Sequence, residues 1–351
     1  MIKSAINFGY QLSKLWLGAN RDQLKPKPED HNKQYTGKKI SLSTTFALTF
    51  VCNFECAHCG ADIDNSKAHL DIQTERILDL IKEMKVAGML RVGFTGGEPL
   101  VRKGIDKIIN ESAENNLMIS LTTNGWHVPR YIDELKKLNL MVISLDGTEE
   151  VHDFIRRKKG SFKKVMEAIK IAKKNNIPVL VNTCVMSSNL DNISEVSKLV
   201  KELNVNWTVD AYIDHTLIKK WQHGSNISRP DIEQFKKVIE EVKTNKKLRN
   251  SDEYLSLIQK KDFPEYCFAG IGYSVISPTG ELYPCFPAQN DPNFKGMDLK
   301  KMTFKEAFEK MPLYRAGCKN CDAICHMEVN NLYSFKQSSI KQAFRYLKNN
   351  S

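Results

Sequence analysis

The chain has 351 residues, of which 41% are hydrophobic, and a formal net charge of +11. This composition is typical of a globular protein with a real core, and no run approaches the ~18 consecutive apolar residues of a membrane-spanning helix. Nine cysteines in clustered spacing, with no signal peptide, favour metal ligands in a reducing cytoplasm over disulfides. The positive charge suits an anionic substrate or surface, but no recognition motif predicts a nucleic-acid partner.

Residues 1–40 are expected to form an amphipathic helix followed by a linker. The apolar side chains recur at spacings of three and four, at Ile2, Ala5, Phe8, Leu12, Leu15 and Trp16. Residues 336–351 form a similar basic and partly apolar tail. Such segments dock on their own domain or lie on a membrane surface, so peripheral membrane contact stays open as an alternative.

A strand-then-helix rhythm follows over residues 41–248. Strands are expected at 45–51, 90–94, 118–122, 141–145, 179–185 and 206–209. Helices are expected at 75–86, 105–114, 130–138, 162–175, 192–203 and 230–243. Six units in series predict an α/β fold, a partial (β/α)6 TIM-like barrel, in which active-site groups lie at the C-terminal ends of the strands.

Three cysteines, Cys52, Cys56 and Cys59, follow the first expected strand within eight residues. A [4Fe–4S] cluster usually has four cysteine ligands, so three would leave one iron open. Zinc is the alternative, although zinc sites favour C-x2-C pairs and a fourth ligand. The spacing C-x3-C-x2-C after an apolar segment resembles the radical S-adenosylmethionine (SAM) superfamily. The resemblance implies that the open iron binds SAM, which is cleaved reductively to a 5′-deoxyadenosyl radical, and that His58 stacks on the cofactor or supports the ligands.

A glycine-rich run follows the second expected strand, with Gly96, Gly97, Glu98 and Pro99 in succession. Two glycines permit close backbone approach, and the proline stiffens the exit. The run resembles the one that binds the methionyl ammonium of SAM in the same superfamily. Asn124 follows the third strand, either as a residue lining the site or as part of an Asn-Gly turn.

The fourth expected strand ends in Ser-Leu-Asp-Gly and is followed by His-Asp-Phe-Ile-Arg. This passage resembles the branch of the superfamily that has C-terminal cluster domains. The resemblance implies that Ser144 and Arg156 bind the ribose and carboxylate of SAM. Because Arg157 stands where the family usually has glycine, either arginine could make the contact. Asn182 and Asp210 are further candidates for the pocket, with a structural role as the alternative.

Five cysteines lie in the last quarter of the chain: Cys267, Cys285, Cys318, Cys321 and Cys325. A hairpin is expected between the first two, with strands at 273–276 and 281–283. The pattern resembles the SPASM and twitch domains, which hold auxiliary [4Fe–4S] clusters. It implies one auxiliary cluster within residues 249–335, held by the first four cysteines, with the last as a spare or the true fourth ligand. A zinc ribbon is the alternative. Lone Cys184 is expected to be a buried small hydrophobe.

The resemblance implies a radical SAM enzyme that abstracts hydrogen from a small molecule, a lipid-linked intermediate or a peptide. A peptide is less favoured, because few residues precede the first strand. The auxiliary cluster would accept an electron, and a flavodoxin- or ferredoxin-type protein would donate one. The alternative is a zinc- or cluster-bearing binding protein at a membrane surface, without catalysis. We expect a cytoplasmic location, peripheral to the membrane at most.

Overall fold

The computed structural model describes residues 2–213, 227–260, 265–316, 321 and 324–342. Nine strands form one sheet in the order β6-β5-β4-β3-β2-β1-β7-β8-β9, which has two free ends and is therefore not closed. The strands are β1 (Ser43–Ala47), β2 (Arg91–Thr95), β3 (Met118–Thr123), β4 (Leu140–Ser144), β5 (Val179–Val185), β6 (Asn206–Ala211), β7 (Tyr273–Ile276), β8 (Glu281–Tyr283) and β9 (Met297–Asp298). Strands β1 to β6 pair in parallel with their neighbours, which confirms the predicted partial barrel.

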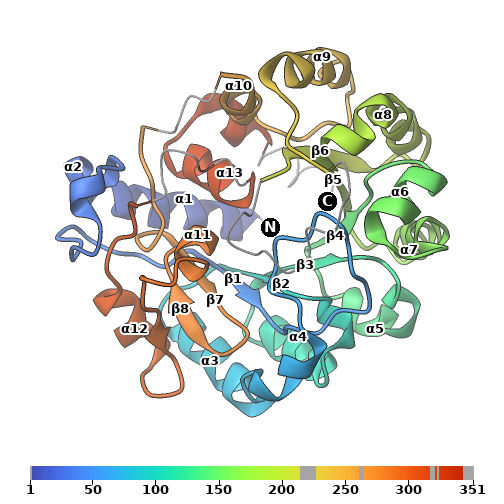
Figure 1. Ribbon diagram of the computed structural model, residues 1–351. Helices are drawn as coiled ribbons and strands as arrows, with labels where there is room; N and C mark the ends of the chain where they lie inside the picture. Colours follow the sequence, from blue (N-terminus) through green and yellow to red (C-terminus); the bar gives the residue numbers. More distant parts are fainter. Residues whose placement is uncertain (1, 214–226, 261–264, 317–320, 322–323, 343–351) are drawn as a thin grey trace.

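Helices follow most strands and cover the outside of the sheet (Figure 1). The α-helices are α1 (Ile2–Leu17), α2 (Arg21–Leu24), α3 (Thr74–Val86), α4 (Ile105–Glu114), α5 (Ile132–Leu135), α6 (Glu149–Arg156), α7 (Ser161–Lys174), α8 (Ile193–Glu202), α9 (Ile232–Val242), α10 (Asp252–Lys260), α11 (Phe286–Gln289), α12 (Phe304–Lys310) and α13 (Ile324–Tyr333). The 3-10 helices are η1 (Pro28–Asp30), η2 (Asn65–Leu70), η3 (Pro99–Val101), η4 (Val128–Arg130) and η5 (Ser187–Asn192).

Side chains alternate between the two faces of each strand. On the outer face Phe46 and Phe94 are paired in register and buried in one core with residues of α3 and α4. On the inner face polar residues are in register, as where Ser144 pairs with Asn182 and Asn182 with Thr208. The interior of the barrel is therefore polar at the strand ends, whereas the contacts with the helices are apolar.

Two predicted elements differ from those observed by more than two residues at an end. The first strand ends at Ala47, and beyond it the carbonyls of Thr49 and Val51 accept hydrogen bonds from the loop that follows β2. The helix expected at 130–138 is split into η4 and α5, because Tyr131 lies between them with a non-helical φ of −121° and ψ of 28°. Neither change alters the order of the strands.

The predicted hairpin near the C-terminus is present and continues the barrel sheet. Strand β7 pairs in parallel with β1, and Ser43 lies opposite Tyr273. Strands β8 and β9 then extend the sheet in antiparallel fashion. Gly280, at the turn between β7 and β8, has a φ of +87°, a conformation that glycine adopts without strain.

The N-terminal helix α1 docks on the chain itself. Leu12 and Leu15 are buried in a cluster that contains Phe268 and Tyr333. The Trp16 ring meets Phe268 edge-on, at a centroid distance of 5.7 Å. Of the other residues expected on this face, the side chains of Ile2, Ala5 and Phe8 lie outside the described part of the chain, as do residues 343–351 of the tail. Among the helices that the structure describes, none is long and apolar enough to cross a membrane.

Candidate functional site

The cysteine loop lies between β1 and η2. The Cys52 N–H donates to the Asn65 side chain at 3.0 Å, and the Cys59 N–H donates to the Cys56 carbonyl at 3.2 Å. All three cysteines are free thiols. Burial raises the pKa of Cys52 to about 12 and that of Cys59 to about 11. Without a cation these thiols would therefore keep their protons at neutral pH.

The glycine-rich run packs its backbone against the cysteine loop. The Gly97 N–H donates to the Thr49 carbonyl at 2.8 Å, and the Glu98 N–H donates to the Val51 carbonyl at 2.9 Å. A Cβ atom on Gly97 would lie 2.0 Å from the Val51 carbonyl oxygen, and Gly96 has a φ of +121°. Glycine is thus required at both positions, because any side chain would push the two loops apart.

The Glu98 side chain connects the ends of β2 and β3. It is 1% exposed, and its carboxylate accepts hydrogen bonds from the Thr123 hydroxyl, the Asn124 N–H and the Leu100 N–H at 2.8, 2.8 and 3.1 Å. Burial raises the pKa of Glu98 to about 7 despite these donors. The Asn124 side chain in turn donates to the side-chain oxygen of Asn53, on the cysteine loop, at 2.8 Å.

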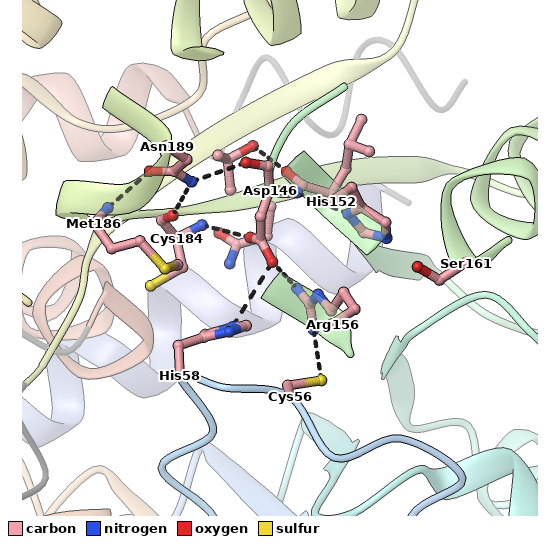
Figure 2. Close-up of polar contacts among 12 residues, drawn as sticks. Cys56, His58, Asp146, His152, Arg156, Ser161, Cys184, Met186 and Asn189 are labelled. Carbon is pink, nitrogen blue, oxygen red and sulfur yellow. Dashed lines mark hydrogen bonds and ion pairs between the residues drawn. The ribbon is translucent and has the colours of Figure 1, made fainter. Parts of the chain in front are cut away.

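A buried ion pair lies at the end of β4 (Figure 2). The Arg156 guanidinium is 2.7 Å from a carboxylate oxygen of Asp146, and these side chains are 11% and 0% exposed. The same guanidinium contacts the Cys56 sulfur at 3.9 Å, and His58 Nε2 lies 3.8 Å from Asp146. Burial opposes ionisation of Asp146, but the neighbouring Arg156 holds its pKa below the usual range.

Backbone and side-chain donors fix Asp146 in place. The Cys184 N–H donates to its carboxylate at 3.1 Å, and the Asn189 amide donates to its carbonyl at 2.8 Å. The Asp146 N–H donates to His152 Nδ1 at 3.1 Å. Because burial lowers the pKa of His152 to about 4, the imidazole is neutral and can accept this bond.

The two adjacent arginines point to different places. Arg156 ends α6 and faces the cysteine loop, where the Ile155 carbonyl also accepts from the Ala57 N–H at 2.9 Å. Arg157 is exposed and caps the helix with a φ of +49°. That left-handed position is the one that glycine usually fills at helix ends. Of the two, Arg156 therefore lies at the site.

The remaining strand-end candidates lie beside this pair. Ser144 faces Asn182 in register, and the Asn182 amide donates to the Asp210 carboxylate at 3.3 Å. Burial, with a contribution from Asp146, raises the pKa of Asp210 to about 7. Cys184 is only partly buried and packs against a small cluster of Ile155, Met186 and Tyr212, so the expectation of a buried small hydrophobe is wrong in degree.

The C-terminal cysteines are described only in part. Cys267 and Cys285 are 8% and 6% exposed and belong to one buried cluster. Cys321 is partly buried. Cys318 and the side chain of Cys325 lie outside the described residues. Within the described residues, no three His, Cys, Asp or Glu side chains converge on a single ion position. The choice of auxiliary ligands stays a prediction.

Several residues of the site, among them Asp146 and Asn53, have no role in the prediction from the sequence. The sequence does contain a signal for Asp146, because this residue belongs to the Ser-Leu-Asp-Gly motif at the end of the fourth expected strand. Asn53 had none, because its contact with Asn124 depends on how two loops fold together. Among the described residues the Asn53 Nδ2 atom is buried and has no hydrogen-bond acceptor.

Comparison with known proteins agrees with this geometry. The model of the radical SAM superfamily matches residues 46–200. The AdoMet-dependent heme synthase of Methanosarcina barkeri is 26% identical over 294 residues, which cover 76% of this chain and 82% of that protein. The PqqA peptide cyclase of Gluconobacter oxydans is 24% identical over 300 residues, which cover 80% of this chain and 82% of that protein.

A solved structure shares the fold. Streptococcus suis SuiB bound to S-adenosylmethionine superposes with a TM-score of 0.64 at 18% identity, over 86% of this chain and 76% of SuiB. SuiB has also been solved with its precursor peptide SuiA, and that structure has a TM-score of 0.63 at 18% identity, over 86% of this chain and 74% of SuiB. At this identity the likeness concerns the fold alone. The chain therefore carries, over residues 46–200, the domain that defines the radical SAM superfamily of enzymes.

Proposed function

We propose that this enzyme cleaves SAM reductively at a [4Fe–4S] cluster held by Cys52, Cys56 and Cys59, and abstracts hydrogen from a bound substrate. The observation that carries this proposal is the packing of the cysteine loop on the Gly96–Pro99 loop through two backbone hydrogen bonds. These loops lie at the C-terminal ends of β1 and β2, where parallel α/β folds bind their ligands. A binding protein without catalytic activity would not need the glycine-rich loop to pack on the cysteine loop.

The residues of the loop fit a cluster. Three thiols whose pKa values burial raises need a metal in place of the proton to become thiolates. The Arg156 guanidinium offsets the negative charge of the Cys56 thiolate. The buried Asn53 Nδ2 donor fits an anionic group beside it, such as the sulfur of a cluster or a carboxylate.

When bound, the cluster and SAM supply the 5′-deoxyadenosyl radical. The residues of this chain would bind and orient. Gly96 and Gly97 keep the space between the loops free of side chains, and Glu98 holds the ends of β2 and β3 together. Asp146 anchors Arg156 at the cluster loop. Ser144 and Asn182 line the adjacent strand ends, where we place the ribose of SAM.

A peptide is the substrate that we favour. The PqqA peptide cyclase is similar over 80% of this chain, and the fold of SuiB accommodates a precursor peptide. Haem formation is the second candidate, because the heme synthase is similar over 76% of the chain. Small molecules and lipid-linked intermediates have no comparable support.

We also propose one auxiliary [4Fe–4S] cluster held by the C-terminal cysteines. Cys267 and Cys285 flank the β7–β8 hairpin and share one buried cluster of side chains. Cys318 and Cys321 would supply the other two ligands, with Cys325 as a spare or as the true fourth ligand. A cluster with a full cysteine shell has no open iron, which favours accepting an electron from the substrate over binding it.

Anaerobic reconstitution with iron and sulfide tests the proposal. We expect bound [4Fe–4S] by Mössbauer spectroscopy and formation of 5′-deoxyadenosine from SAM under dithionite. Cys56→Ala should abolish both the SAM cleavage and the spectral signature of the SAM-binding cluster, while Lys305→Ala on the remote helix α12 should change neither. A wild-type protein that binds zinc alone and leaves SAM intact would refute the assignment.

The class of substrate can be tested by measuring 5′-deoxyadenosine in the presence of candidate substrates. Short peptides encoded beside the gene should stimulate the formation of 5′-deoxyadenosine. The mass of these peptides should change in the same reaction. Stimulation by tetrapyrrole precursors of haem, with no effect of the peptides, would favour the second candidate.

A further inference from the structure

A strongly basic surface segment connects α6 to α7. Residues 154–164 contain six lysines and arginines and no acidic residue. Arg156 points inward to the site, whereas Arg157 and Lys159 are exposed and Phe154 is 61% exposed. We call Phe154, Trp126, Arg157, Lys158 and Lys159 the basic surface.

The basic surface lies directly outside the cysteine loop. The Lys158 ammonium is 5.2 Å from the centroid of the Trp126 ring, which itself meets Phe54 of the cysteine loop edge-on at 5.7 Å. A backbone hydrogen bond also joins the cysteine loop to α6 here, because the Ala57 N–H donates to the Ile155 carbonyl. A protein bound here would therefore be separated from the cysteines by little more than one layer of side chains.

The nearby carboxylates of the described residues pair with other groups and leave the charge of Lys158 and Lys159 in excess. Glu149 pairs with Lys163 at 3.0 Å and Glu167 pairs with Lys164 at 2.8 Å. Asp153 accepts from the backbone and side chain of residues 160–162. Glu55, on the cysteine loop, is the exposed acid closest in sequence to the cysteines. Among the described residues no carboxylate lies within ion-pair distance of Lys158 or Lys159.

Arg157 extends the same surface from the end of α6. A non-glycine residue with a φ of +49° has a strained backbone at a helix end where glycine would be less costly. Here the side chain is a cation beside Lys158 and Lys159.

We propose that the basic surface docks the acidic electron-donor protein, of the flavodoxin or ferredoxin type, that reduces the cluster; the inference rests on the proposed function. In each encounter the donor loses one electron and the cluster gains one, and no bond is made or broken. Complementary charge at such a surface steers association and raises its rate, while the aromatic side chains supply apolar contact.

The test uses the reconstituted holoenzyme and photoreduced flavodoxin under anaerobic conditions. Stopped-flow bleaching of the cluster measures the rate of electron transfer. For the double variant Lys158→Glu with Lys159→Glu, we expect the second-order rate to fall about tenfold or more at low ionic strength. The difference should shrink at high salt, because salt screens exposed charges. Dithionite-driven cleavage of SAM should be unchanged.

A matched charge reversal, Lys305→Glu with Lys310→Glu on α12 at the opposite end of the sheet, should leave the flavodoxin rate within twofold (Figure 1). Equal rates for the two double variants would overturn the proposal. So would a loss of dithionite-driven cleavage in the first, since the segment would then support the cluster itself. Phosphatidylserine vesicles that bind wild type but not the variant, with unchanged flavodoxin kinetics, would reassign the surface to a membrane. Failure of wild type to cleave SAM with dithionite would instead refute the proposed function.

Discussion

Replacing Asp146 by asparagine should strongly destabilise the protein. Asp146 is fully buried and lies 2.7 Å from the Arg156 guanidinium. Asparagine keeps an oxygen that can accept the Cys184 N–H, a bond of 3.1 Å in the structure. Its amide nitrogen, however, would replace the oxygen that faces Arg156. The variant therefore leaves a nearly buried cation without its counterion and sets two donors against each other.

The expected loss is about 3–5 kcal/mol of unfolding free energy, the usual cost of removing one partner of a buried ion pair. The pair itself need not stabilise the fold by this amount, because most of the cost is the charge left behind. Asp146→Asn combined with Arg156→Gln removes that charge and restores a neutral hydrogen-bonding pair. We expect the double variant to be more stable than the sum of the single effects by about 1–3 kcal/mol.

Urea unfolding of the reduced apoprotein, followed by circular dichroism, measures these terms. Arg157→Gln is the matched control, and as an exposed substitution it should change stability by no more than about 0.5 kcal/mol. A loss below about 1 kcal/mol for Asp146→Asn, or strictly additive single effects, would refute the reasoning. Iron content after reconstitution should also fall in Asp146→Asn, because Arg156 would lose its anchor beside Cys56.

Three further predictions concern the same parts of the fold. Arg157→Gly should raise stability by about 1 kcal/mol in urea unfolding, because glycine adopts the φ of +49° without strain. Gly97→Ala should cost about 1–3 kcal/mol and lower iron binding, because its Cβ would lie 2.0 Å from the Val51 carbonyl oxygen. Burial raises the pKa of Glu328 to about 7, so the folded state holds a proton that the unfolded chain releases near pH 4.5. Stability should therefore fall as pH rises from about 5 to 7. Glu328→Gln should remove the part of this decline that Glu328 causes, up to about 3 kcal/mol at pH 8 relative to pH 5, while Glu98 and Asp210 keep theirs.

Each of these has a control and an opposing outcome. Arg157→Ala should bring no gain, so an equal gain from alanine and glycine would contradict the backbone explanation. Gly9→Ala, on helix α1 with open space around it, should not destabilise, and a similar loss at both glycines would contradict the argument from loop packing. Glu240→Gln, at an exposed site, should leave the pH profile unchanged. An unchanged profile in Glu328→Gln as well would show that this carboxyl does not carry the dependence.

The sequence by itself predicted the chemistry of the site and determined the succession of the parallel strands β1 to β6. The patterns that predict the site are local, because each can be recognised within a short stretch of sequence. They are three closely spaced cysteines, two adjacent glycines, and an arginine after Ser-Leu-Asp-Gly. The alternation of strands and helices is likewise local, since it follows from periodic burial of apolar side chains. The partial barrel could therefore be predicted before any contact was known.

Only the tertiary structure decided which groups meet. The assignment of Arg156 rather than Arg157 depends on where helix α6 ends, and the counterion role of Asp146 depends on that helix returning over β4. The contact between Asn53 and Asn124 joins loops 71 residues apart. The addition of β7 to the edge of β1 joins strands more than 200 residues apart in the chain. Such contacts are set by packing between distant segments, which no local pattern encodes.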